Sequence, residues 1–320
     1  MSRLFSVIAL LLLTLSLTTA AQAQSHAQLR VLTSIKPLQL IAAAVQDGLG
    51  QPEVLLPPGA SPHHYALRPS DVRRVREADL LYWIGPELEN FLPRVLAGRD
   101  RPSVAVQQLP NMSLRHFGDS HAEQAEHDEH DEHQSSAADQ HDHDHRPGSL
   151  DAHLWLLPAN ARVIAAKMAA DLAAADPANA ARYQANVQAF DARLSALDRR
   201  LQARLSALAG KPYFVFHEAY DYFEAAYGLE HAGVFSVLGE VQPGAQHVAA
   251  MRQRLQQAGP TCVFSEPPLR PRLAETLTAG LPVTLAELDA MGGALPVDAG
   301  GYEALLENLA SELAGCLEAL

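Results

Sequence analysis

Positive charge is scarce in this chain, and its scarcity argues against nucleic acid as a partner. The 320 residues include 24 lysines and arginines against 37 aspartates and glutamates, which gives a formal net charge of −13 at pH 7. Proteins that bind DNA or RNA rely on clustered Lys and Arg to neutralise phosphates. An acidic surface attracts cations instead, so we expect no nucleic-acid partner.

Long apolar runs are also scarce. The one such run, residues 4–17, follows Arg3 and leads to the small residues Ala21 and Ala23. This pattern is typical of a secretory signal peptide, so residues 1–23 are predicted to be removed on export. The run is short for a membrane span, and no cysteine follows it that could carry a lipid. The sequence therefore predicts a soluble exported protein of the periplasm.

Cysteine is nearly absent, because only Cys262 and Cys316 occur. A thiolate metal site would usually need a close CxxC pair or more cysteines. In an oxidising compartment, an isolated pair of this kind favours a disulfide. We therefore predict that Cys262 and Cys316 are bonded.

Strand-like and helical stretches alternate across residues 24–175 and again across 211–320. Such alternation is typical of parallel sheets flanked by helices. Between the two regions, residues 176–210 continue without a helix breaker after Pro177, and apolar residues recur there every three or four positions. The apolar stripe comprises Tyr183, Val187, Phe190, Leu194, Leu197, Leu201, Leu205 and Leu208.

The pattern predicts an α/β fold of two Rossmann-like lobes joined by one long rigid helix. In open α/β sheets, ligands bind beyond the carboxyl ends of the strands. We therefore expect the site in the cleft between an N-terminal lobe, residues 24–175, and a C-terminal lobe, residues 211–320.

Residues 116–149 form an insertion rich in histidine, aspartate and glutamate. Such a tract binds transition metals through imidazole and carboxylate groups. It lacks the aliphatic residues needed to offset the entropy of ordering, so we expect a disordered loop that binds metal loosely and serves as an accessory. Its candidate accessory ligands are His116, His121, His127, His130, His133, His141, His143 and His145.

Few other histidines remain, and three of them follow predicted strands or lie at a lobe junction. These are His63, His153 and His217, and Asp289 follows the last predicted strand in the same manner. Because they come from both lobes, we expect them to converge in the cleft, with His64 as a substitute for His63. Imidazole nitrogens suit Zn²⁺, and three of them with one oxygen donor form a tetrahedral site. The remaining histidines are read as surface or structural residues: His26, His231 and His247.

Five segments resemble the motif set of the ZnuA family, the periplasmic zinc-binding proteins of bacterial ABC zinc importers. They are PPGASPHHYALRPSD, DAHLWLLPANA, YFVFHEAYDYF, FSEPPLRP and LDAMGG. The resemblance covers essentially the whole mature chain, and it implies zinc bound between two Rossmann-like lobes joined by a rigid helix.

On the family pattern, His63, His153 and His217 match the three zinc-binding histidines, and Asp289 matches a carboxylate that is a ligand in manganese-binding relatives. The two cysteines match a disulfide of Gram-negative members. One departure concerns the fourth ligand. Some members carry Glu directly before the first histidine, where this chain has Pro62. The fourth position is therefore open to Asp289, His64 or water.

We predict a solute-binding protein, not an enzyme, that captures Zn²⁺ and delivers it to a membrane ABC permease by transient docking, acting as a monomer. One alternative is a zinc-dependent hydrolase, since three histidines and a water also form a hydrolytic site. However, the HExxH motif is absent, because Asp221 stands where its second histidine would be. Another alternative is a metal buffer that acts through the His-rich loop alone.

Overall fold

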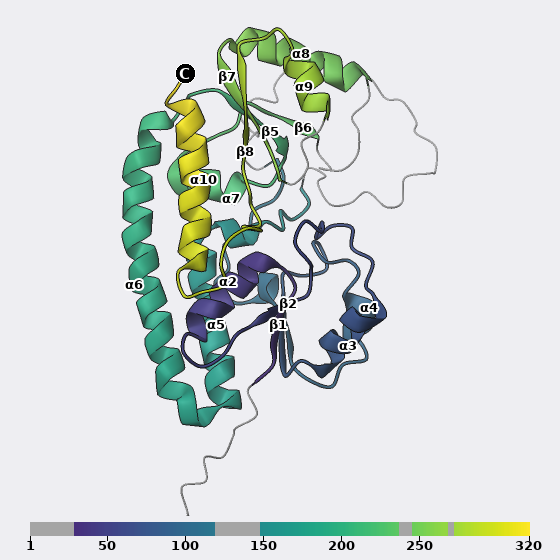
Figure 1. Ribbon diagram of the computed structural model, residues 1–320, viewed down its shortest axis with the longest axis vertical. Coiled ribbons are helices and arrows are strands. Elements are labelled where there is room, and N and C mark those ends of the chain that lie inside the picture. Colours follow the sequence, from purple (N-terminus) through teal and green to yellow (C-terminus); the bar gives the residue numbers. More distant parts are fainter. Residues whose placement is uncertain (1–28, 119–147, 237–244, 268–271) are drawn as a thin grey trace, which may run out of the picture.

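The computed structural model describes residues 29–118, 148–236, 245–267 and 272–320. This part of the chain forms two lobes, each built on a four-stranded parallel sheet with helices packed around it (Figure 1). The predicted α/β fold is therefore confirmed. The predicted signal peptide, residues 1–23, lies outside the described residues, as do residues 119–147 of the His-rich segment.

The sheet of the first lobe has the strand order β2-β1-β3-β4, and all its pairings are parallel. Strands β1 and β3 are buried throughout and, apart from Thr33, carry apolar or aromatic side chains, as expected for a sheet covered on both faces. The strands are β1 (Val31–Thr33), β2 (Glu53–Val54), β3 (Leu80–Trp83) and β4 (Ser103–Ala105). The helices of this lobe are α2 (Lys36–Val45), α3 (Pro69–Glu77), α4 (Pro93–Leu96) and α5 (Pro158–Ala175).

The sheet of the second lobe has the order β6-β5-β7-β8 and is also parallel. Its strands are β5 (Tyr213–His217), β6 (Gly233–Ser236), β7 (Thr261–Ser265) and β8 (Val283–Glu287). Its helices are α7 (Asp221–Tyr227), α8 (Ala245–Ala258), α9 (Arg272–Thr278) and α10 (Gly301–Leu317). The matching strand orders place the carboxyl end of a central strand, β1 or β5, near the middle of each lobe.

A long helix, α6 (Ala180–Leu205), connects the lobes, and short 3₁₀ turns extend it at both ends. Its 26 residues span about 39 Å. The side chains predicted to form the apolar stripe are buried, with the exception of Val187, which is partly buried. Asn186 fixes the helix to the first lobe, because its Nδ2 donates hydrogen bonds of 2.9 Å to the carbonyls of Val45 and Asp47.

Helix α10 belongs to the second lobe in sequence but packs along α6 and against α2 of the first lobe (Figure 1). Tyr302 on α10 donates a 2.7 Å hydrogen bond to the carbonyl of Trp155, and the indole N–H of Trp155 donates one of 2.9 Å to the carbonyl of Ala290. The two lobes therefore share packing through α6, α10 and a buried indole.

The predicted disulfide is confirmed. Cys262 on β7 is bonded to Cys316 on α10, across a sequence separation of 54 residues. In the chain-entropy account, a disulfide that closes a loop of this length stabilises the folded protein by about 4 kcal/mol. The bond ties the sheet of the second lobe to the helix that crosses back to the first.

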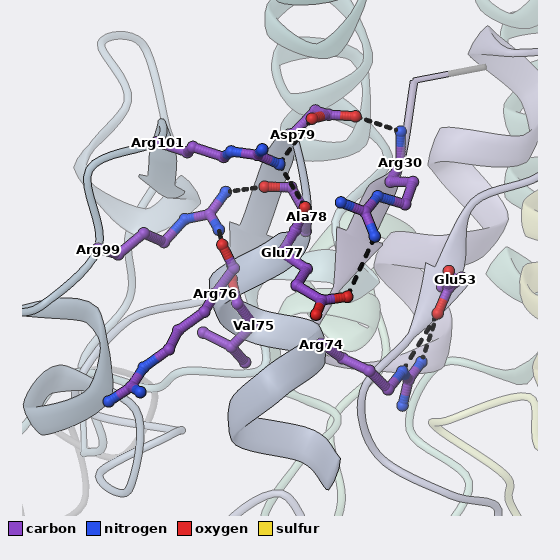
Figure 2. A network of polar contacts seen from close by, with 10 residues as sticks. All are labelled: Arg30, Glu53, Arg74, Val75, Arg76, Glu77, Ala78, Asp79, Arg99 and Arg101. Atoms are coloured by element: carbon purple, nitrogen blue, oxygen red, sulfur yellow. Dashed lines mark hydrogen bonds and ion pairs between the residues drawn. The ribbon is translucent and has the colours of Figure 1, made fainter. Parts of the chain in front are cut away.

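A network of arginines and carboxylates covers the amino ends of the first sheet (Figure 2). Arg101 pairs with Asp79 at 2.7 Å, and Asp79 accepts a 2.8 Å hydrogen bond from the backbone N–H of Arg30. Arg99 donates to the carbonyls of Val75 and Ala78 at the end of α3, where no later helical turn could satisfy them. These contacts lie at the end of the sheet opposite to the carboxyl ends of its strands.

The two ends of the His-rich segment meet. His116 forms an isolated antiparallel bridge with Leu150, and the backbone of Phe117 is hydrogen-bonded to both Ser149 and Gly148. The side chain of Phe117 is buried. The edges of the predicted loop, residues 116–118 and 148–149, are therefore part of the folded lobe. Among the helices in the described ranges, none has the length and apolar character needed to cross a membrane.

Candidate metal centre

Three imidazoles from both lobes converge at one point. His63 lies in the loop after β2, His153 lies directly before a short 3₁₀ turn (Leu154–Leu156), and His217 is the last residue of β5. The ring centroids of His153 and His217 are 4.9 Å apart, and His63 lies 5.5 Å and 5.4 Å from them. One nitrogen from each ring lies within 4.8 Å of the other two. Around tetrahedral zinc, such nitrogens are about 3.3 Å apart, a spacing that lies within this limit.

Asp151 holds the imidazole of His153. Its Oδ1 lies 2.7 Å from Nδ1 of His153 and accepts a 2.9 Å hydrogen bond from the backbone N–H of the same residue. Both residues are buried, with 2% of His153 exposed. A carboxylate can only accept, so Nδ1 carries the proton and Nε2 is the ring atom with a lone pair for a cation.

Glu266 holds the imidazole of His217 in the same way, with Oε2 3.0 Å from Nδ1. Glu266 follows β7, the strand beside β5. The hydroxyl of Tyr220 donates to Oε1 of Glu266 at 3.3 Å and lies 2.7 Å from the carbonyl of Leu288. Two of the three imidazoles are thus oriented by a carboxylate behind them, an arrangement that fixes the tautomer and raises the basicity of a metal ligand.

The electrostatics of these two histidines differ. Burial, followed by the nearby charge of His217, lowers the pKa of His153 well below its ordinary value, which keeps that ring neutral. Burial also acts to lower the pKa of His217, but the charge and hydrogen bond of Glu266 outweigh it and raise the pKa. A metal ion would therefore meet a neutral ligand at His153 and would displace a proton at His217.

The other residues considered for the fourth position lie outside this group of three. Asp289 follows β8, and its carboxylate accepts backbone hydrogen bonds of 2.9, 2.8 and 2.7 Å from Met291, Gly292 and Gly293. His64 is exposed, and its ring centroid is 6.5 Å from that of His63. The structure brings together the three predicted histidines and leaves Asp289 in a turn of its own.

Of the eight histidines predicted as accessory ligands, the structure describes His116, which is exposed at the base of the segment. The other seven lie outside the described residues, and so does His26. His247 lies on α8. His231 was read as surface or structural. It is buried and lies close to Glu218 and Asp221, in a second group whose atoms could hold a cation.

The role of Asp151 was missed in the sequence. Its signal is the Asp-x-His spacing of Asp151 and His153, which places the carboxylate within reach of both the backbone N–H and the ring. Glu266 has the corresponding supporting position for the second imidazole, through its hydrogen bond with His217. Neither contact is visible in the periodicity of the sequence.

Comparison with known proteins adds a family. Residues 31–316 match the ZnuA family model, "Zinc-uptake complex component A periplasmic". A Yersinia pestis protein named "High-affinity zinc uptake system protein ZnuA" is 39% identical over 289 residues, covering 90% of this chain and 91% of that protein. A protein of the same name from Haemophilus influenzae is 31% identical, covering 96% of this chain and 98% of that protein.

Solved structures share the fold. The structure titled "Crystal structure of ZnuA" superposes with a TM-score of 0.72 at 23% identity, covering 90% of this chain and 99% of that one. The solute-binding protein FpvC from Pseudomonas aeruginosa, solved in complex with Mn²⁺, gives a TM-score of 0.71 at 20% identity, covering 91% and 99%. At these identities the likeness supports the two-lobed architecture alone.

Proposed function

Because this chain belongs to the ZnuA family of periplasmic zinc-uptake components, we propose that it captures Zn²⁺ in the periplasm between its two lobes and delivers the ion to an ABC permease. Zinc is the cargo of this protein. The proposed ligands are the Nε2 atoms of His153 and His217 together with His63, and a fourth donor from Asp289 or water.

The observation that carries this proposal is the convergence of three imidazoles from two lobes, two of them held by buried or partly buried carboxylates. Nitrogen donors favour zinc over harder ions such as Mn²⁺ and Mg²⁺. A site divided between lobes also suits a carrier, because separating the lobes takes His217 away from His63 and His153. We propose that transient docking on the permease releases zinc in this way.

Several finer features belong to the same proposal. Residues 1–23 act as a cleaved export signal, and the mature chain works as a monomer. The His-rich segment collects zinc near the cleft without forming the principal site. The site binds and does not catalyse: Glu218, which would be the base of an HExxH motif, lies in the group with Asp221 and His231.

Metal analysis and zinc competition titration against a chelator test the proposal. The protein should retain one tightly bound zinc per chain, and zinc should raise its melting temperature, because a ligand that binds the folded state stabilises that state. A zinc-loaded protein should show no activity in an assay panel for ester, peptide and phosphate hydrolysis.

Deleting residues 119–147 separates the principal site from the segment. The pairing of Phe117 with Gly148 and Ser149 holds the two cut ends close together, so a short linker can replace the segment. The deletion variant should keep the tight zinc and lose only weaker binding. If it shows no zinc-dependent stabilisation, the buffer function is correct and the carrier proposal is wrong.

A further inference from the structure

A second cluster of metal-binding side chains begins at the residue after His217. Glu218 follows β5, Asp221 opens α7, and His231 lies just before β6. One oxygen or nitrogen atom from each lies within 4.8 Å of the other two. Successive side chains of an extended chain point to opposite sides, so His217 and Glu218 lead to two different groups.

The first observation that points to a ligand concerns Asp221. Its side chain is 5% exposed, and its Oδ1 atom accepts no hydrogen bond from any residue that the structure describes. Leaving a buried carboxylate oxygen without a partner costs several kcal/mol more than pairing it. A cation among Glu218, Asp221 and His231 would satisfy this oxygen.

The second observation concerns the orientation of His231. Its Nδ1 lies 2.9 Å and 3.1 Å from the two carboxylate oxygens of Glu224, and the hydroxyl of Tyr213 donates to Glu224 at 2.6 Å. Gly228 ends α7 in the left-handed conformation, with a φ of 70°, and returns the chain so that His231 reaches Glu224. The resulting pair repeats the arrangement of Asp151 with His153, in which a carboxylate on Nδ1 directs Nε2 toward a cation.

The charges around Asp221 also favour a cation. Burial raises its pKa to about 6, and the negative charges of Glu224 and Asp151 act in the same direction, opposed by His231 and Arg115. Counted together with Glu218 and Asp221 themselves, the carboxylates of this region outnumber the positive groups His231 and Arg115. Glu218 is the least buried of the three residues, so it lies on the side of the group nearest to solvent.

We propose that Glu218, Asp221 and His231 form a second binding site for a divalent transition-metal ion, with Glu224 as the positioning residue for His231. Two carboxylates and one imidazole make a harder donor set than three imidazoles. Such a set accepts Mn²⁺ as well as Zn²⁺. This site lies wholly within the second lobe and goes beyond the zinc-carrier function.

A proton on Nε2 of His231 is the competing occupant. Burial acts to lower the pKa of His231, but the hydrogen bond and charge of Glu224 raise it to about 9. A metal ion must displace that proton, so the binding experiment belongs at about pH 8 rather than in acid.

The test uses the full chain, first loaded with one equivalent of Zn²⁺. In one arm Mn²⁺ is then titrated, and its free concentration is read from its electron paramagnetic resonance signal. In the other arm a second equivalent of Zn²⁺ is titrated against a chelator. The variants are Asp221→Asn and His231→Gln, which keep side-chain size, and the matched control is Glu312→Gln, an exposed carboxylate on α10.

We expect the wild type and Glu312→Gln to bind one further ion in at least one arm. Asp221→Asn and His231→Gln should bind it at least tenfold more weakly, with the affinity for the first zinc unchanged. Retention of the first zinc also shows that the variants are folded. If one of these variants does not fold, Glu218→Gln, at a partly exposed position, replaces it in the experiment.

Two results would overturn the inference. If the wild type takes up no further ion in either arm, a proton on His231 suffices for the cluster. If the variants bind the further ion as tightly as the wild type does, that ion is bound elsewhere, for example by the His-rich segment. Neither result touches the zinc-carrier proposal, which depends on the first zinc.

Discussion

Two groups of potential metal ligands diverge from the carboxyl end of β5, and they differ in both donors and span. The group at His217 contains three imidazoles and joins two lobes, whereas the group at Glu218 contains one imidazole and two carboxylates within residues 218–231. Both use a carboxylate behind a histidine, as in Asp151 with His153 and Glu224 with His231. Because both groups have a carboxylate hydrogen-bonded to a histidine, the numbers of imidazoles and carboxylates in each group determine which cation it prefers.

The difference in span has a mechanical consequence. A cation among His63, His153 and His217 is held only while the two lobes keep their mutual position. A cation among Glu218, Asp221 and His231 depends on the local path of the chain from β5 through α7 to β6. On the proposed function, a separation of the lobes would take ligands away from a cation in the first group and would leave the ligands of a cation in the second group in place.

The largest expected effect is the removal of an imidazole from the lobe-spanning group. His153→Ala and His217→Ala should each weaken zinc binding by more than about 100-fold, or about 2.7 kcal/mol, because a protein nitrogen donor is lost. His64→Ala, at the exposed neighbour of His63, is the control and should bind zinc as the wild type does. Zinc competition titration measures all three variants. Unchanged affinity in His217→Ala would make that residue a bystander and would break the lobe-spanning assignment.

The next effect concerns the supporting carboxylates. Asp151→Asn and Glu266→Gln should each weaken zinc binding by about 10- to 100-fold, since the imidazole behind which they stand loses orientation and basicity. Glu224→Gln makes the corresponding change in the other group and should leave the first zinc unchanged. The comparison fails if Glu224→Gln weakens the first zinc as much as Asp151→Asn does.

The effect of pH follows from the raised pKa of His217. Its proton competes with zinc at every pH below that raised pKa. As the pH is lowered, zinc affinity should therefore already decrease before pH 6.5, the ordinary pKa of histidine, is reached. Below the raised pKa, the affinity should decrease by about tenfold per pH unit. The folding stability of the metal-free protein should change with pH in the opposite direction. The protonated His217 paired with Glu266 contributes stability that is fully present below about pH 6.5 and is lost as pH rises through the raised pKa.

Titrations at several pH values, with zinc and without it, measure both trends. Glu266→Gln is the matched variant, because it removes the charge that raises the pKa of His217. In that variant the proton should compete with zinc only at lower pH. An identical pH profile in Glu266→Gln and in the wild type contradicts the assignment of the competing proton to His217.

Part of the candidate site could be predicted from the sequence, because ligands in open α/β sheets bind beyond the carboxyl ends of the strands. His63 follows β2 and His217 ends β5, and each parallel sheet brings such positions to its carboxyl edge, where ligands bind. The long helix was predictable because its apolar stripe repeats over many turns, and the pairing of Cys262 with Cys316 followed from their isolation in an exported chain.

Contacts between distant segments could not be predicted in this way. Glu266 reaches His217 because β7 pairs with β5, an adjacency that sequence order alone does not specify. Helix α10 packs against α2 of the first lobe as well as along α6, and its apolar stripe in the sequence does not specify which lobe it covers. The burial of His231 depends on the turn at Gly228 and on Glu224, so the sequence alone left open whether this histidine is a surface or a structural residue.

The smallest expected effect concerns Asp289. Its carboxylate already accepts three backbone hydrogen bonds in the turn after β8, and it lies outside the three-imidazole group. If water fills the fourth position, Asp289→Asn keeps an oxygen for the N–H groups of Met291 and Gly292 and should weaken zinc binding by less than about tenfold. If Asp289 is a ligand, the same change removes a charged oxygen donor, and zinc affinity should fall by more than tenfold. Zinc titration of Asp289→Asn beside Asp298→Asn, an acidic residue that also accepts a backbone hydrogen bond in a turn, distinguishes the two. A large loss in Asp289→Asn alone would place a carboxylate in the lobe-spanning group and would narrow its difference from the group at Glu218.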